Sequence, residues 1–162
     1  MRTDNAAAIH RQDYAPPAFL VDTIDIGFDL DPAETRVAAR TVLRHNPKSE
    51  STDLILHGEE LELVALRMNG KALNQRQYRR EAGRLVIPNA PAKVTLEIET
   101  LIHPQENTSL MGLYVSNGNF FTQCEAEGFR KITYFPDRPD VMAKYRVMLR
   151  ADKEQYPVLL SN

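Results

Sequence analysis

The sequence contains a single cysteine, Cys124, among its 162 residues, so no disulfide can form within the chain. Seven glycines and ten prolines are too few for a collagen-like or low-complexity chain. No apolar run approaches the roughly 18 residues of a membrane-spanning helix, and residues 1–10 hold no apolar stretch of signal-peptide length. We therefore expect a cytoplasmic protein with no membrane partner.

An excess of charge of either sign is also missing, because 20 Lys and Arg residues face 22 Asp and Glu residues and leave a net charge of −2. Nucleic-acid binding normally requires a clear basic surplus, so we expect no nucleic-acid partner. The 43% hydrophobic and 26% charged content is typical of globular proteins. We expect residues 1–162 to form one domain, since this length can bury its own core.

Motifs of a self-sufficient enzyme are missing as well. No His-Glu-x-x-His, Cys-x-x-Cys, Gly-x-Ser-x-Gly or phosphate-binding Gly-rich loop occurs. We expect no metal site in this chain, and we place its scattered histidines on the surface or at a sheet edge: His10, His45, His57 and His103. Cys124, close to two phenylalanines, fits a small buried apolar residue better than a nucleophile.

The sequence is rich in apolar residues with a period of two, which indicates β-strands. Residues 21–30 and 35–44 alternate in this way on either side of Asp31-Pro32 and predict a hairpin. Asn69-Gly70 predicts a tight hairpin turn after residues 61–68. The same pattern predicts further strands at 53–57, 78–80, 84–87, 93–102, 113–115, 120–123 and 145–151.

These short strands, separated by polar turns, predict an all-β fold, either an antiparallel sandwich or a bent sheet. Residues 33–38 and 140–144 have a weak helical pattern, and we expect short helical turns there beside proline. Residues 156–162 are mostly apolar and end without a charged tail. Two interpretations stay open: the chain is a domain of a longer protein, or residues 158–160 pack on the sheet edge of a small complete one.

Polar chemistry concentrates in residues 120–140. In extended backbone, Gln123, Glu125 and Glu127 would lie on one side and face the same space. The residues alone also allow a solvated strand face, or a loop held by ion pairs of Glu127 and Asp137 with Arg130 and Arg138.

The segment Gln123-Cys-Glu-Ala-Glu-Gly-Phe-Arg130, together with residues 14–22, 107–114, 132–145 and 151–162, closely resembles the bacterial aminopeptidase N family of zinc aminopeptidases. The resemblance implies a saddle-like β-sheet domain at the N-terminus of a four-domain enzyme. It implies that zinc is bound by a catalytic domain that follows, because the family's Gly-Ala-Met-Glu-Asn and His-Glu-x-x-His motifs do not occur here. This chain alone is then expected to be inactive.

The same resemblance implies roles for two residues. Glu125 matches the family's glutamate that helps to hold the α-amino group of a peptide substrate, and Gln123 matches the glutamine that lines the pocket for the first side chain. Four further matching residues are expected to be loop scaffolding: Glu127, Arg130, Asp137 and Arg138. The implied partners are peptides with a free N-terminus and the catalytic domain of the same chain. The alternative function is a stand-alone β-sandwich that binds peptides or proteins through the Glu125 face.

Overall fold

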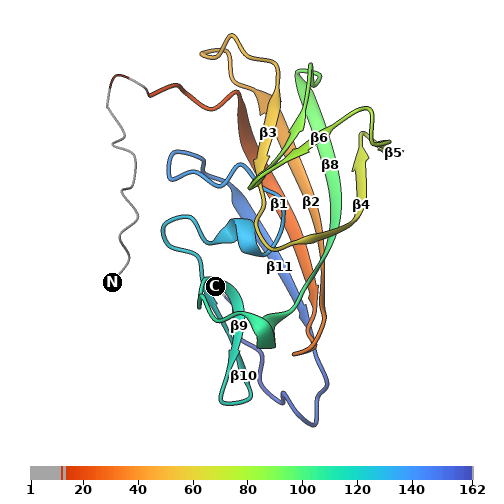
Figure 1. Cartoon of the computed structure of the whole chain (residues 1–162), viewed down its shortest axis with the longest axis vertical. Coiled ribbons are helices and arrows are strands. Elements are labelled where there is room, and N and C mark those ends of the chain that lie inside the picture. The colour runs from red at the N-terminus through yellow and green to blue at the C-terminus, as the bar shows by residue number, and fades with distance from the viewer. Residues whose placement is uncertain (1–11, 13, 162) are drawn as a thin grey trace.

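The structure is a computed structural model that describes residue 12 and residues 14–161. Within them the chain forms mainly strands, with two short 3-10 helices before and after the β9–β10 hairpin (Figure 1). In chain order the elements are β1 (Phe19–Asp29), β2 (Thr35–His45), β3 (Leu54–His57), β4 (Glu62–Met68), β5 (Lys71–Ala72), β6 (Arg79–Glu81), β7 (Arg84–Ile87), β8 (Lys93–Ile102), η2 (Pro104–Glu106), β9 (Gly112–Ser116), β10 (Asn119–Gln123), η3 (Phe129–Lys131) and β11 (Lys144–Arg150). The fold is all-β, as predicted.

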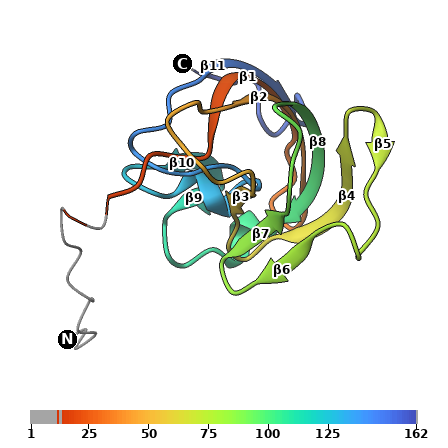
Figure 2. The ribbon, with the colours of Figure 1, turned by 90° about the horizontal axis from the view of Figure 1, so that it is seen from above.

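The strands make three sheets. The largest has the order β11-β1-β2-β8-β4-β5, the second is β3-β7-β6, and the third is the β9–β10 hairpin. Figure 2 shows the large sheet bending around β3, β7 and β9, which lie on its inner side. This bend gives the predicted curved sheet and creates an inner face that the two smaller sheets cover.

Strand alternation determines the core. Ile24, Ile26 and Phe28 of β1 point inward and are at most 6% exposed, as the sequence predicted. On β8 the inward residues Val94, Leu96 and Ile98 are also buried, again as predicted. From the smaller sheet, four fully or nearly fully buried side chains complete this core: Leu54, Leu56, Leu85 and Ile87. Burial of apolar side chains at about 1.5–3 kcal/mol each supplies the main stabilising contribution.

The predicted hairpins are present. β1 pairs with β2 in antiparallel register, and Asn69 and Gly70 adopt positive φ angles of 52° and 78° between β4 and β5. The strand β11 departs from the predicted antiparallel arrangement, because it runs parallel to β1, with Lys144 opposite Thr23. A parallel neighbour requires a long connection. Residues 30–143 separate β1 from β11 in the chain, and their last part, residues 124–143 between β10 and β11, includes the candidate site.

Two predictions about local structure are wrong. Residues 33–38 do not form a helical turn: β2 begins at Thr35, because its residues pair with β1 and β8. Residues 140–144 contain the end of a turn and the start of β11, while the 3-10 helices lie at η2 and η3.

The proposed packing of residues 158–160 on the sheet edge is also not found. Val158 is 71% exposed and Leu160 is 86% exposed. Among the residues that the structure describes, no helix has the length and apolar character needed to cross a membrane.

Candidate functional site

The candidate site begins at the β9–β10 hairpin, which the sequence correctly predicted. Asn117 and Gly118 turn the chain with φ angles of 48° and 75°, the left-handed conformations that tight hairpins require. Five paired residues on each strand then lead to Gln123, which lies opposite Gly112. The hairpin therefore carries Gln123 to the edge of a small, well-defined sheet.

After Gln123 the chain leaves the sheet and turns back over residues 124–128. The Glu125 N–H donates to Gln123 Oε1 at 3.2 Å, and the Gly128 N–H donates to the Cys124 carbonyl oxygen at 2.8 Å. The expectation that extended backbone places Gln123, Glu125 and Glu127 on one side is wrong, because β10 ends at Gln123. All three side chains are exposed, and a hydrogen-bonded turn determines their arrangement.

Arg130, in η3, anchors this turn to the rest of the protein. Its backbone N–H and its Nε both donate to Asp137 Oδ2, at 3.0 and 2.9 Å, and its Nη2 donates to the Asp137 carbonyl oxygen at 2.8 Å. The same guanidinium forms ion pairs with Glu127 at 3.0 Å and with Glu59 at 3.7 Å. Three segments thus meet at one side chain, which is only 15% exposed.

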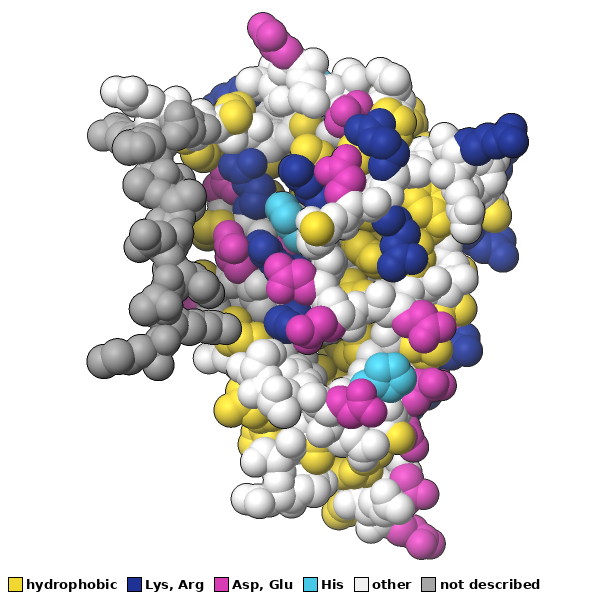
Figure 3. Space-filling view, in the orientation of Figure 1, with side chains coloured by type: hydrophobic (Ala, Val, Ile, Leu, Met, Phe, Trp, Pro, Cys, Tyr) yellow, Lys and Arg dark blue, Asp and Glu magenta, His cyan; other side chains and the backbone are white. Residues whose placement is uncertain are grey.

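The charges around Arg130 outweigh the effect of its burial. Burial by itself lowers the pKa of Arg130, but the hydrogen bond to Asp137 and the negative charges of Glu127 and Glu59 raise it overall. Figure 3 shows acidic and basic side chains side by side in this area of the surface. The predicted ion pairing of Glu127 and Asp137 with Arg130 is confirmed.

Glu125 differs from its acidic neighbours. Its exposed carboxylate forms no ion pair with any residue that the structure describes, whereas Glu59, Glu127 and Asp137 all contact Arg130. An exposed carboxylate without an ion-pair partner among the described residues can accept a cation from outside the domain.

Arg138 belongs to a separate cluster, so its predicted pairing with Glu127 or Asp137 is wrong. It donates to both oxygens of Asp140, at 2.8 and 2.7 Å, and to the Ala15 carbonyl oxygen at 2.9 Å. The Tyr14 hydroxyl also donates to Asp140, at 3.1 Å. The hydrogen bond and charge of Arg138 lower the pKa of Asp140. This cluster fastens residues 14–15 to the loop before β11.

Comparison with known proteins identifies the domain. Residues 21–162 match the family described as the Peptidase M1 N-terminal domain. The chain belongs to this family. It is 48% identical over 163 aligned residues to aminopeptidase N of Caulobacter vibrioides, and 44% identical over 161 to aminopeptidase N of Escherichia coli. The alignments cover 100% and 99% of the chain but 18% of each relative, so the chain spans under a fifth of their length.

Solved structures agree with this M1 assignment. An aminopeptidase A of Legionella pneumophila, solved in complex with aspartic acid, superposes with a TM-score of 0.86 at 38% identity, covering 93% of the chain and 18% of that protein. An M1 zinc metallopeptidase of Deinococcus radiodurans has a TM-score of 0.68 at 12% identity, covering 83% and 32%, and shares the fold. The predicted recognition of an aminopeptidase N domain is confirmed.

Two groups of the M1 domain next to the site, His57 and Cys124, have shifted pKa values that no sequence motif indicates. His57, at the end of β3, exchanges backbone hydrogen bonds with Phe135, and its Nδ1 is buried without a partner among the described residues. Burial, followed by the charge of Arg130, lowers the pKa of His57. Cys124 is partly buried, and burial raises the pKa of its thiol to about 11, which fits the predicted apolar role. His10 lies outside the described residues.

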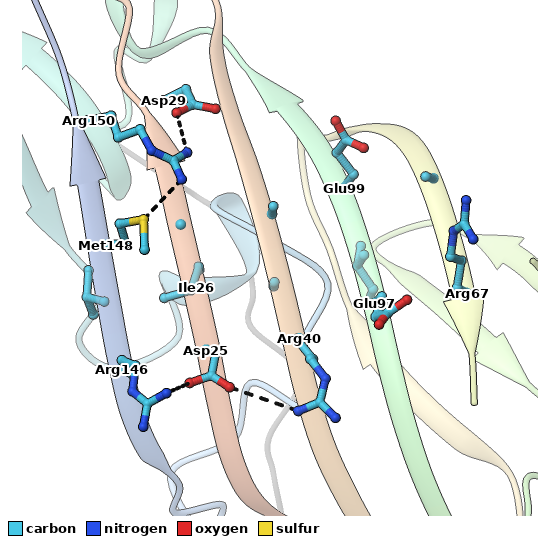
Figure 4. Close-up of a pocket in the computed structure, with 16 residues that line it drawn as sticks. Asp25, Ile26, Asp29, Arg40, Arg67, Glu97, Glu99, Arg146, Met148 and Arg150 are labelled. Carbon is cyan, nitrogen blue, oxygen red and sulfur yellow. Dashed lines mark hydrogen bonds and ion pairs between the residues drawn. The ribbon is translucent and has the colours of Figure 1, made fainter. Parts of the chain in front are cut away.

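A hollow of about 530 Å³ lies on the other face of the large sheet (Figure 4). Asp25 sits between Arg146 at 3.5 Å and Arg40 at 4.0 Å, and Asp29 pairs with Arg150 at 2.8 Å. These charges neutralise one another across neighbouring strands and are well exposed to water. None of the residues that line this hollow belongs to the Gln123–Gly128 turn.

No metal centre is formed by the part of the chain that the structure describes, where no three His, Cys, Asp or Glu side chains come together in a suitable group. The residues present therefore do not fit a zinc ion.

Proposed function

We propose that this chain is the N-terminal domain, over residues 1–162, of a four-domain cytoplasmic zinc aminopeptidase, and that it covers the active site of the catalytic domain. The M1 family assignment and the two relatives named aminopeptidase N support this function. The 18% coverage of those relatives supports placing zinc and its ligands in parts of the enzyme outside this chain. The single cysteine supports a reducing compartment.

Glu125 is proposed to hold the α-amino group of the substrate. The observation that carries this role is its unpaired carboxylate beside acidic neighbours that are all paired with Arg130. An aminopeptidase must recognise a chain end, and a carboxylate shielded from water favours a free ammonium over an internal peptide segment. Gln123, whose Oε1 already accepts the Glu125 N–H, is proposed to line the pocket for the first side chain.

The catalytic domain of the same enzyme is proposed as the surface that covers this turn. Apolar side chains near the turn support this contact: Leu110 is 53% exposed and Phe121 is 47% exposed. Phe121 stacks on Tyr114 with ring centroids 5.7 Å apart, so the hairpin presents a preformed aromatic surface. Exposed apolar groups of this kind are typical of interfaces between domains.

The test is Glu125→Ala in the full-length enzyme, assayed with an alanyl anilide. We expect catalytic efficiency to fall by at least about 2 kcal/mol, or roughly 30-fold, because a charge-assisted contact to a shielded ion is lost. Glu50→Ala is the control, since Glu50 is an exposed carboxylate between β2 and β3 and away from the turn. Unchanged efficiency of Glu125→Ala would refute the anchoring role.

A second measurement addresses the isolated 162-residue chain. We expect it to bind no stoichiometric zinc and to hydrolyse no aminoacyl anilide, because residues 14–161 bring together no metal-ligand set. Reproducible, chelator-sensitive hydrolysis by the pure chain would contradict this expectation.

A further inference from the structure

Asp137 accepts three hydrogen bonds from Arg130, the residue that holds the turn of the candidate site. It is buried, with 7% of its surface exposed, and its Oδ2 accepts both the backbone N–H and the Nε of Arg130. Its backbone carbonyl oxygen accepts a third hydrogen bond from Nη2 of the same arginine. One residue thus fixes the main chain of η3 and the plane of the guanidinium together.

The turn that bears Glu125 is continuous with this arrangement. The turn closes through the hydrogen bond from the Gly128 N–H to the Cys124 carbonyl oxygen, and η3 begins at the next residue. Nη2 of Arg130 also pairs with Glu127 at 3.0 Å, two residues from Glu125. Arg130 therefore restrains the turn that contains Glu125 in two ways: its backbone N–H is fixed by Asp137, and its side chain holds Glu127.

Stability alone is a poor reason for such an arrangement. Replacing a buried ion pair by apolar residues of similar volume is often neutral or stabilising. Hydrogen bonds from two nitrogens of one planar guanidinium to the side chain and backbone of the same residue instead contribute a defined geometry. Its contact with Glu127, in the turn that carries the exposed and unpaired carboxylate of Glu125, indicates that the geometry serves that carboxylate.

We propose that Asp137 is a positioning residue for Glu125, acting through Arg130, and that it determines how well the enzyme recognises a free α-amino group. This inference rests on the proposed role of Glu125. Without the Asp137 carboxylate, Arg130 loses two hydrogen bonds and keeps only the one from Nη2 to the backbone carbonyl oxygen, so Glu127 and Glu59 can draw the guanidinium toward the surface, and the turn follows it. A shift of about 1 Å in an anchoring group is sufficient to cost on the order of 100-fold in rate.

The experiment is a double-mutant cycle in the full-length enzyme with Glu125→Gln, Asp137→Asn and the double variant, measured as KM and kcat for an alanyl anilide. Asp137→Asn keeps the shape of the side chain but removes its charge. The matched control is Asp140→Asn, which removes a similarly paired carboxylate three residues away that holds residues 14–15 and not the Glu125 turn. Thermal unfolding of each variant reports the amount of folded enzyme.

We expect Asp137→Asn to raise KM by about tenfold, in the range expected for a misplaced binding group. The double variant should be no worse than Glu125→Gln alone, because a misplaced anchor and a missing anchor are lost only once. Asp140→Asn should leave KM unchanged. Arg130→Lys keeps the positive charge without the planar fork, so it should also raise KM, which provides a second route if Asp137→Asn folds poorly.

The outcomes are distinguishable. If Glu125→Gln raises KM but Asp137→Asn and Arg130→Lys only lower the amount of folded enzyme at unchanged KM, the positioning role is overturned and the proposed function stands. If the effects of Glu125→Gln and Asp137→Asn add in the double variant, Asp137 acts elsewhere and the inference is also overturned. If Glu125→Gln itself has no effect, the proposed anchor is wrong and the inference is overturned with it.

Discussion

Replacing Gly128 by alanine tests whether the turn that carries Glu125 depends on close backbone packing. Gly128 has φ −96° and ψ −14°, a conformation that alanine adopts without strain, so only space can oppose the substitution. A Cβ at this position would lie 2.6 Å from the Gln123 carbonyl oxygen, 2.8 Å from Cys124 Cα and 2.9 Å from Met111 Cε. The first two atoms are backbone and cannot rotate away.

Two effects of opposite sign give the magnitude for Gly128→Ala. Overpacking typically costs about 1–3 kcal/mol, while the lower entropy of the unfolded alanine chain returns about 0.4–1 kcal/mol. Because two of the crowded atoms are main chain, we expect a net loss of about 1–2 kcal/mol in the free energy of unfolding. For a chain of this length the midpoint temperature should fall by about 2–8 °C.

The assay is thermal and urea unfolding of the 162-residue chain, followed by circular dichroism, with Gly27→Ala as the matched control. A Cβ on Gly27 would meet its nearest atom, the Ala38 carbonyl oxygen, at 4.0 Å, so alanine has room there. We expect the control to be neutral or slightly stabilised. A Gly128→Ala chain as stable as the Gly27→Ala chain would refute the view that the turn is fixed by backbone contact.

The remaining predictions concern groups with shifted pKa values. The hydrogen bond from Arg138 lowers the pKa of Asp140 below its usual 3.8, so the pairing of Arg138 with Asp140 should stabilise the fold above pH 3.8 and lose this contribution as pH falls through the lower folded pKa. Asp140→Asn should therefore weaken the acid dependence of the free energy of unfolding, and an unchanged dependence would contradict this prediction. Burial raises the pKa of the Cys124 thiol to about 11, so iodoacetamide at pH 8 should alkylate the native chain much more slowly than the urea-unfolded chain, and equal rates would contradict the burial.

The sequence predicted where the strands lie better than it predicted which strands pair with one another. Alternation identifies which residues of a strand face the core, and Ile24, Ile26 and Phe28 do so as expected. Alternation within one strand contains no information about which strand lies beside it, however. The β11 strand was therefore predicted, but its parallel pairing with β1, about 120 residues earlier in the chain, was not.

The ion pairs at the candidate site were likewise predicted by residue type but not by partner. Residue types and local spacing suggested that Glu127, Asp137, Arg130 and Arg138 pair, but spacing could not decide which acid meets which base. The 3-10 helix η3 carries Arg130, which pairs with Glu127 and Asp137, while Arg138 pairs with the nearby Asp140. Contributions from β3 and the β3–β4 connection, His57 and Glu59, depend on tertiary packing and leave no signal in the local sequence.

Because Glu125 has no ion-pair partner among the described residues, the proposed covering of the turn by the catalytic domain would itself favour a substrate with a free α-amino group. In the isolated domain its carboxylate is exposed, so water solvates the charge and no partner is needed. If the catalytic domain covers the turn as proposed, that hydration is lost, and a shielded carboxylate without a cation becomes unfavourable by several kcal/mol. A substrate ammonium restores the balance, whereas an acylated N-terminus does not. The selectivity for free N-termini then follows from closure over one unpaired acid, and it requires that Arg130 holds the neighbouring acids Glu59, Glu127 and Asp137 in ion pairs, so that Glu125 is the carboxylate left for the substrate.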